Sequence, residues 1–169
     1  MLTSAYEAYQ SLWKRVKERS LQYYDMYPGD VRVVKRIIRV LLDEPVTLPS
    51  GGKLTARRFL SLGLILGGSP SAFASLHVLI STACLESDGD KVEFSRAFLK
   101  SVDSEQSFDD HPIYFLMHES IYADGPNLSP TKWAAHRAYE EHVKMSPEYD
   151  YKNTCTLDTD DERPTLFFG

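Results

Sequence analysis

The hydrophobic positions at the start of the chain recur with the spacing of an α-helix. The apolar residues that share this spacing are Leu2, Tyr6, Tyr9, Trp13, Val16 and Tyr23. Ser4 followed by Glu7 is a capping-box pattern, which marks the start of a helix. Because proline breaks helices, Pro28 sets the end of this one. The pattern therefore predicts a first amphipathic helix that ends near Tyr27.

A second helix is predicted from Asp30 to about Asp43, where apolar and charged positions separate onto two faces. The apolar face holds Val31, Val34, Ile38 and Leu41. The charged face holds Arg32, Lys35, Arg36, Arg39 and Asp43. A basic helix face of this kind is either a phosphate-binding stripe or a surface that simply faces water.

Five further helices are predicted from cap residues, prolines and glycines. They run from Thr55 to Gly67, from Ser69–Pro70 to about Leu85, from Lys91 to Val102, from His111–Pro112 to near Gly125, and from Ser129–Pro130 to before Pro147. Residues 148–162 are polar and acidic without a helical period, and 163–169 form a short β-type run. We expect a mainly α fold of six or seven helices, with a helical domain over 1–147. The tail, 148–169, is then an acidic linker followed by a β-strand stub.

The composition is that of an ordinary globular chain with a modest negative charge. The sequence has 169 residues, a length typical of one domain, and a formal net charge of −5. Nucleic-acid binding depends on a basic surface, so this charge argues against nucleic acid as a partner. No apolar run approaches the roughly 20 residues that a membrane span needs, so we expect no membrane association.

The cysteine content and the N-terminal residues indicate the cellular compartment of the protein. Cys84 and Cys155 are the two cysteines of the chain, which indicates reduced thiols in a reducing compartment. The first turns of the chain include Glu7, Lys14 and Arg15, so they lack the unbroken apolar stretch of a signal peptide. These features predict a cytoplasmic protein.

Motifs for catalysis and metal binding are present only in part. The segment from Gly67 to Ala72 resembles the nucleophile elbow G-x-S-x-G, with Ser69 as its serine. The elbow needs the backbone N–H of the residue after the serine, and Pro70 has none, so we interpret Ser69 as a helix cap. No metal-ligand spacing occurs among His77, His111, His118, His136 and His142. We expect no metal and no cofactor in this chain, and no nucleophilic role for Ser69.

The predicted helix after Pro112 carries one conspicuous carboxylate. Glu119 shares its face with Phe115 four residues earlier and Tyr122 three residues later. A carboxylate among aromatic residues on an apolar helix either faces solvent or lines a cavity. Asp109 and Asp110, just before this helix, are interpreted as N-terminal charge and cap residues.

Four stretches of the chain resemble one protein family. They are YYDMYPGDVRVVKRII (23–38), LPSGGKLTARRFLSLGLILGGS (48–69), HPIYFLMHESIYADG (111–125) and SPTKWAAHRAY (129–139). In this order they are similar to the cap region of the proline iminopeptidases, or prolyl aminopeptidases, which are serine peptidases of the α/β-hydrolase fold. The resemblance runs from about Tyr6 to Gly169.

The resemblance implies a helical cap, or lid, without the catalytic α/β core. In the family, the nucleophilic serine lies before the cap, and the catalytic aspartate and histidine lie after it. The resemblance therefore places all three groups outside this chain. The complete enzyme releases N-terminal proline from peptides, and its cap covers the active site and binds the amino terminus of the substrate. We expect the chain alone to be inactive and to work only with a complementing hydrolase core.

The resemblance also assigns residues to the substrate site. Glu119 matches the acidic residue of the cap that binds the cationic amine of the substrate. Phe115, Tyr122 and Trp133 are candidates for the apolar wall around the pyrrolidine ring, or else belong to the core. The alternative function is a stand-alone helical protein-interaction module without an enzymatic role, whose exposed apolar face binds a partner.

Overall fold

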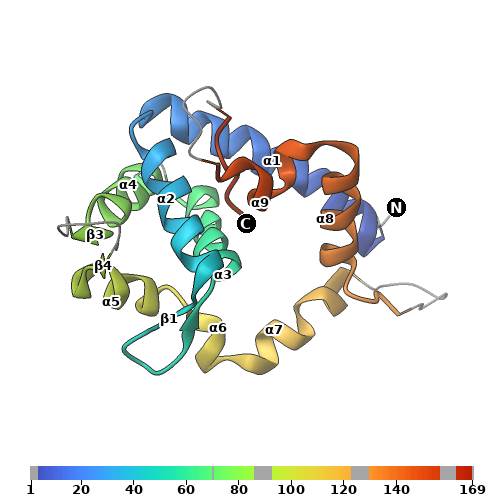
Figure 1. The fold of residues 1–169 in the computed structure, drawn as a ribbon. Helices are drawn as coiled ribbons and strands as arrows, with labels where there is room; N and C mark the ends of the chain where they lie inside the picture. Colours follow the sequence, from blue (N-terminus) through green and yellow to red (C-terminus); the bar gives the residue numbers. More distant parts are fainter. Residues whose placement is uncertain (1–3, 70, 86–92, 123–129, 157–162, 169) are drawn as a thin grey trace.

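The structure is a computed structural model that describes residues 4–69, 71–85, 93–122, 130–156 and 163–168. Within these residues the fold is mainly α, as predicted (Figure 1). The α-helices are α1 (Ala5–Met26), α2 (Asp30–Asp43), α3 (Ala56–Leu60), α4 (Ala72–Ser81), α5 (Arg96–Ser104), α6 (Ser107–Asp110), α7 (Pro112–His118), α8 (Ala134–Met145) and α9 (Tyr151–Thr154). The 3₁₀ helices are η1 (Ser61–Gly67), η2 (Glu119–Tyr122) and η3 (Pro147–Tyr149). The strands β1 (Val46–Thr47) and β2 (Lys53–Leu54), and β3 (Cys84–Leu85) and β4 (Glu93–Phe94), form two antiparallel pairs.

The two helices at the start of the chain form where their patterns predict. Helix α1 has the expected capping box, in which the Glu7 N–H donates to Ser4 Oγ at 3.3 Å and the Ser4 N–H donates to the Glu7 carboxylate at 3.0 Å. Helix α2 buries Val34 and Ile38 completely, as its apolar face predicts. Lys35, expected on the charged face, is buried instead, so the charged face is narrower than predicted.

The core lies between α1, α2, α3, η1, α4 and α5. Its largest fully buried side chains include Tyr23 of α1, Ile37 of α2, Phe59 of α3 and Phe98 of α5. Helix α8 packs along α1 on the other side (Figure 1). There Trp13 contacts Tyr139 with ring centroids 5.2 Å apart. Aromatic burial of this extent supplies much of the hydrophobic stabilisation of the fold.

The C-terminal segment 163–168 completes the core. Phe167 is buried, and its N–H donates to Ser20 Oγ at 3.2 Å. The Phe168 N–H donates to the Leu60 carbonyl at 2.7 Å. This close approach depends on Gly63, because a Cβ there would lie 2.1 Å from the Phe168 carbonyl oxygen. The segment forms no strand ladder with any described residue, so the strand stub expected after the acidic linker is absent from this part of the structure.

Several helix boundaries differ from the sequence prediction. The third predicted helix changes to 3₁₀ geometry at Ser61, where the C-terminal segment crosses Gly63. The fourth begins at Ala72 rather than at Ser69–Pro70, and residue 70 lies outside the described residues. The fifth and seventh begin later than expected, at Arg96 and Ala134. Two short helices, α6 and α9, were not predicted because four residues are too few to show a period.

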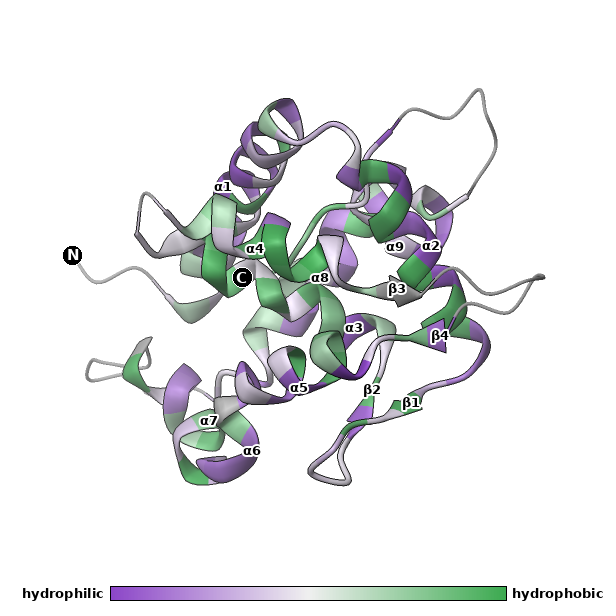
Figure 2. Cartoon of the chain, turned by 90° about the vertical axis from the view of Figure 1, so that its left-hand side faces the viewer, coloured by the Kyte–Doolittle hydropathy of each residue, from purple (hydrophilic) through white to green (hydrophobic). Residues whose placement is uncertain are grey.

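Residues 107–122, which comprise α6, α7 and η2, form an arm at the edge of the molecule (Figure 1). No residue of α7 is buried. The exposed large apolar residues of the arm are Phe108, Ile113, Tyr114, Phe115, Leu116, Met117 and Ile121. Figure 2 shows this arm set apart from the main body, with hydrophobic residues on α7. The arm is therefore an exposed apolar surface of the kind that marks an interaction site.

Candidate functional site

The candidate site lies where the far end of the arm meets helix α8. Glu119 is the first residue of η2, and only 7% of its surface is exposed. Among the described side chains from Phe108 to Ile121, Glu119 alone is buried. Its carboxylate therefore faces the body of the molecule rather than solvent. Of the two interpretations that the sequence left open for Glu119, the solvent-facing one is wrong.

The carboxylate of Glu119 caps the N-terminus of α8. It accepts the backbone N–H of Ala134 at 2.8 Å and that of Ala135 at 3.3 Å. The hydroxyl of Thr131 provides a further hydrogen bond. The first N–H groups of a helix have no partner within the helix, and the helix dipole favours an anion there. Glu119 thus acts as a cap for a helix that begins 15 residues later in the sequence.

The pKa of Glu119 is lowered from its ordinary value. Burial raises the pKa, but this effect is outweighed by the hydrogen bonds from Thr131, Ala134 and Ala135 and by the positive charge of Arg137. Hydrogen bonds and nearby cations favour the ionised form of a carboxyl group. The site therefore presents a carboxylate anion at neutral pH.

The backbone before α8 is strained and supplies no cap of its own. Lys132 has φ 52° and Trp133 has φ 55°, both in the left-handed region that non-glycine residues rarely adopt. Trp133 is the N-cap residue, and its indole side chain has no oxygen to accept a helix N–H. The distant carboxylate of Glu119 takes the place of the usual Ser, Thr, Asp or Asn cap.

Two aromatic side chains flank this carboxylate position. Phe115 on α7 stacks with Trp133, with ring centroids 6.0 Å apart and an interplanar angle of 28°. Phe115 is 53% exposed and Trp133 is 54% exposed, so neither ring belongs to the core. The side chain of Tyr122 lies outside the described residues. The structure thus brings Phe115 and Trp133 together, and Trp133 directly precedes the helix N-terminus that Glu119 caps.

This arrangement suits a small ligand with a cationic donor and an apolar body. A carboxylate has about four acceptor positions, and the three protein donors named above already occupy most of them. A cationic N–H group there would make a charge-assisted hydrogen bond. The exposed faces of Phe115 and Trp133 would contact the apolar part of the ligand.

Thr131 and Arg137 were not predicted as site residues. Both are polar residues in or near a helix, which by itself is no signal of function. Their roles follow from the placement of η2 against the start of α8, because Arg137 also donates to the Thr131 carbonyl at 2.9 Å. Only the three-dimensional structure reveals this contact.

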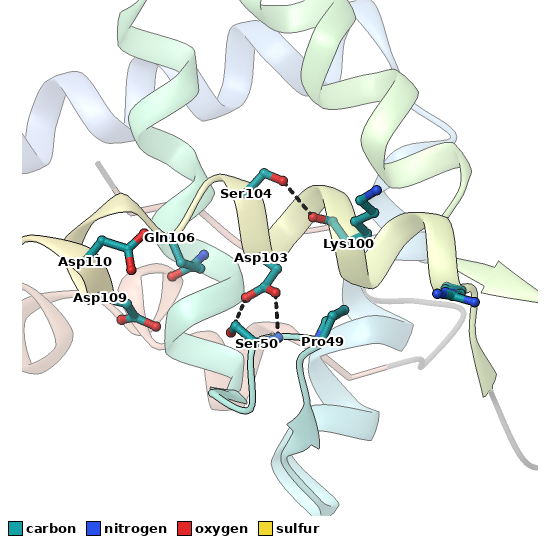
Figure 3. Close-up of a pocket in the computed structure, with 9 residues that line it drawn as sticks. Pro49, Ser50, Lys100, Asp103, Ser104, Gln106, Asp109 and Asp110 are labelled. Atoms are coloured by element: carbon teal, nitrogen blue, oxygen red, sulfur yellow. Dashed lines mark hydrogen bonds between the residues drawn. The ribbon is translucent and has the colours of Figure 1, made fainter.

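A pocket of about 480 Å³ lies away from Glu119, between the β1–β2 hairpin and helices α5 and α6 (Figure 3). Asp103 accepts two hydrogen bonds from Ser50 there, at 2.8 and 2.6 Å. Asp109, on the same wall, forms an ion pair with Arg58. Asp109 and Asp110 are the last residues of α6 and do not cap α7, whose N-cap is His111, so their predicted cap role is wrong.

The remaining sequence motifs take structural roles. Ser69 is not the helix cap that was predicted, because the N-cap residue of α4 is Ser71. Ser69 Oγ lies 2.8 Å from Ser71 Oγ at the turn before α4, and a 3₁₀ helix rather than a strand precedes it. The described residues contain no group of three or more His, Cys, Asp or Glu side chains that could hold a metal ion. Within the same residues, every helix is too short or too polar to span a bilayer.

Comparison with known proteins gives two curated relatives. The chain is 32% identical over 143 residues, or 85% of its length, to a proline iminopeptidase of Aeromonas sobria. It is 34% identical over 107 residues, or 63% of its length, to a proline iminopeptidase of Aspergillus aculeatus. The matched regions are 32% and 23% of those two proteins, so the chain spans at most about a third of their length. No protein-family model matches the chain.

Proposed function

We propose that this chain, a homologue of part of the proline iminopeptidases, is the substrate-recognising cap of a serine hydrolase that releases N-terminal proline from peptides. The homology to two named proline iminopeptidases supports the reaction class. The observation that carries the proposal is the ionised, buried carboxylate of Glu119 beside the exposed rings of Phe115 and Trp133.

The chemistry of the substrate fits this site. The α-amino group of a peptide has a pKa near 8 and is largely cationic at neutral pH. A partly dehydrated cation needs a carboxylate partner to offset its lost hydration. In the proposed complex Glu119 accepts a hydrogen bond from the prolyl amine, and the pyrrolidine ring packs against Phe115 and Trp133.

In this proposal, the reacting groups belong to a catalytic body. That body corresponds to the parts of the relatives that lie outside the region matched by this chain. The regions that the two relatives share with this chain are only 32% and 23% of their own lengths. The exposed apolar arm, residues 107–122, is the surface that such a body would cover. The chain alone then has no peptidase activity. The free, buried Cys155 is consistent with the cytoplasmic location that we propose for it.

A binding measurement on the purified chain tests the amine-recognition role. We expect L-prolinamide to cause saturable NMR shifts at Phe115 and Trp133, and N-acetyl-L-prolinamide to cause none because its nitrogen carries no charge. The Glu119→Gln variant should lose this discrimination between the two ligands. Glu105→Gln, a matched change at an exposed residue at the end of α5, should keep it.

Two results would contradict the proposed function. One is equal binding of the charged and the acetylated ligand by the unmodified chain. The other is hydrolysis of a proline-amide reporter by the purified chain alone, blocked by a serine-directed inhibitor, since this would mean that the chain contains its own nucleophile.

The exposed arm also supports the second candidate function, a helical protein-interaction module. Ile113 is 74% exposed and Met117 is 59% exposed, which is unusual for large apolar side chains on a helix. Size-exclusion chromatography distinguishes the two functions. Aggregation indicates a cap that has lost its catalytic body, whereas a stable monomer indicates an adapted, independent module.

A further inference from the structure

The carboxylate proposed to bind the substrate amine already accepts hydrogen bonds from the protein itself. In the ligand-free structure Glu119 accepts the N–H groups of Ala134 and Ala135, and Thr131 provides another hydrogen bond. With 7% of its surface exposed, Glu119 has little access to solvent. An incoming ammonium group therefore meets a carboxylate whose oxygens point at the start of α8.

The bond to Ala135 is the weaker of the two backbone hydrogen bonds. At 3.3 Å it lies beyond the usual range for N–H to oxygen, whereas the 2.8 Å bond to Ala134 lies within it. An ammonium donor is charged and makes a stronger hydrogen bond than a neutral amide N–H. The ammonium group can therefore displace the Ala135 N–H from the carboxylate oxygen, Oε2, that accepts it.

The backbone next to this hydrogen bond is strained and can relax if the bond is lost. Two consecutive non-glycine residues, Lys132 and Trp133, have left-handed backbone angles, which carry a conformational cost. This strain persists only while surrounding contacts hold it, and the Glu119 cap is the contact immediately beyond it. Release of the cap would let residues 132 and 133 relax, and the Trp133 ring would move with them.

We propose that Glu119 is a latch between helix α8 and the substrate, so that amine binding and capping of α8 compete for the same carboxylate. This inference rests on the proposed function, because it assumes that Glu119 is the amine-binding residue. Its consequence is that substrate binding loosens the first turn of α8 and repositions Trp133. The position of the Trp133 ring then depends on whether a charged substrate amine is bound, and it is not fixed before binding.

A matched pair of variants at residue 133 tests the competition. Trp133→Ser and Trp133→Ala remove the same ring, but serine is a strong N-cap and alanine is a poor one. A serine cap takes over the Ala135 N–H and frees Glu119. Because such a cap is worth about fivefold in equilibrium constant, we expect the Ser variant to bind L-prolinamide about fivefold more tightly than the Ala variant.

Amide hydrogen exchange gives a second readout on the unmodified chain. Saturating L-prolinamide should speed exchange of the Ala135 N–H, because its acceptor is lost, while N-acetyl-L-prolinamide should leave the rate unchanged. A binding site that keeps the same structure when the ligand binds would leave the exchange rate of the Ala135 N–H unchanged.

The outcomes separate the inference from the proposed function. If L-prolinamide binds but the two variants have equal affinity and Ala135 exchange is unaffected, the latch is wrong and amine recognition stands. If neither the unmodified chain nor either variant binds L-prolinamide, both the proposed function and the latch are wrong. If the Ser variant binds more tightly and Ala135 exchange accelerates, the latch is supported.

Discussion

Replacing Gly63 by alanine tests how the C-terminal segment 163–168 contributes to stability. The new Cβ would lie 2.1 Å from the carbonyl oxygen of Phe168 and 2.8 Å from the Cβ of Phe167. Both distances are below 3.0 Å, which real Cβ atoms essentially never show, and the first is to backbone, which cannot rotate away. The alanine variant must therefore push the segment out of its groove between α1 and η1.

The magnitude follows from the contacts that are lost. Phe167 is 1% exposed, and burial of a phenylalanine side chain contributes about 1.5–3 kcal/mol. The hydrogen bond from the Phe168 N–H to the Leu60 carbonyl adds about 1 kcal/mol. We expect Gly63→Ala to lower the free energy of unfolding by about 3 kcal/mol, which is roughly 9 °C in Tm for a chain of this length.

Urea denaturation followed by circular dichroism measures this change. The control is Gly67→Ala in the same 3₁₀ helix, because a Cβ at Gly67 has nothing within 4 Å. That substitution should change stability by less than about 0.5 kcal/mol, as is usual for open surface positions. Equal stabilities for the two alanine variants would refute the packing of segment 163–168 against Gly63.

Two further predictions concern acid stability and the exposed arm. Burial lowers the pKa of His142 below its ordinary value of 6.5, and its Nδ1 atom is buried without a hydrogen-bond partner among the described residues. The unfolded chain therefore binds a proton that the folded chain resists, so the free energy of unfolding should fall as the pH drops below 6.5. Urea titrations at pH 7 and pH 5 should show a smaller fall for His142→Gln than for the unmodified chain. Replacing Ile113 by glutamine should reduce hydrophobic dye binding with less than about 0.5 kcal/mol loss of stability, because this side chain is 74% exposed; a large loss of stability would mean that α7 packs against the body.

The sequence predicts the long helices well because their information is local. The capping box of α1 and the two-sided pattern of α2 lie within the segments that they describe. The change from α-helix to 3₁₀ geometry at Ser61 has no local signal. It coincides with the crossing of Phe168 over Gly63, more than a hundred residues away in the sequence. Tertiary contacts of this kind override local propensity.

The candidate site shows the same division between local and distant information. Periodicity identifies Glu119 as an unusual carboxylate on an apolar helix, but the pattern cannot tell whether it faces solvent. The answer depends on where α8 begins, and that start lies at Ala134 rather than at the expected Ser129–Pro130. The left-handed backbone at Lys132 and Trp133 places the start of α8 at Ala134, and Glu119 caps the helix at that position.

The position of segment 163–168 has a consequence for protein synthesis. Of the described residues, these leave the ribosome last, yet Phe167 fills the space between helices that were made first. Ser20 and Gly63 emerge long before their partners exist, so the nascent chain cannot complete its core until segment 163–168 has been made. A ribosome that stalls before residue 163 would hold a chain with an open apolar groove, which is the kind of surface that chaperones and proteases recognise.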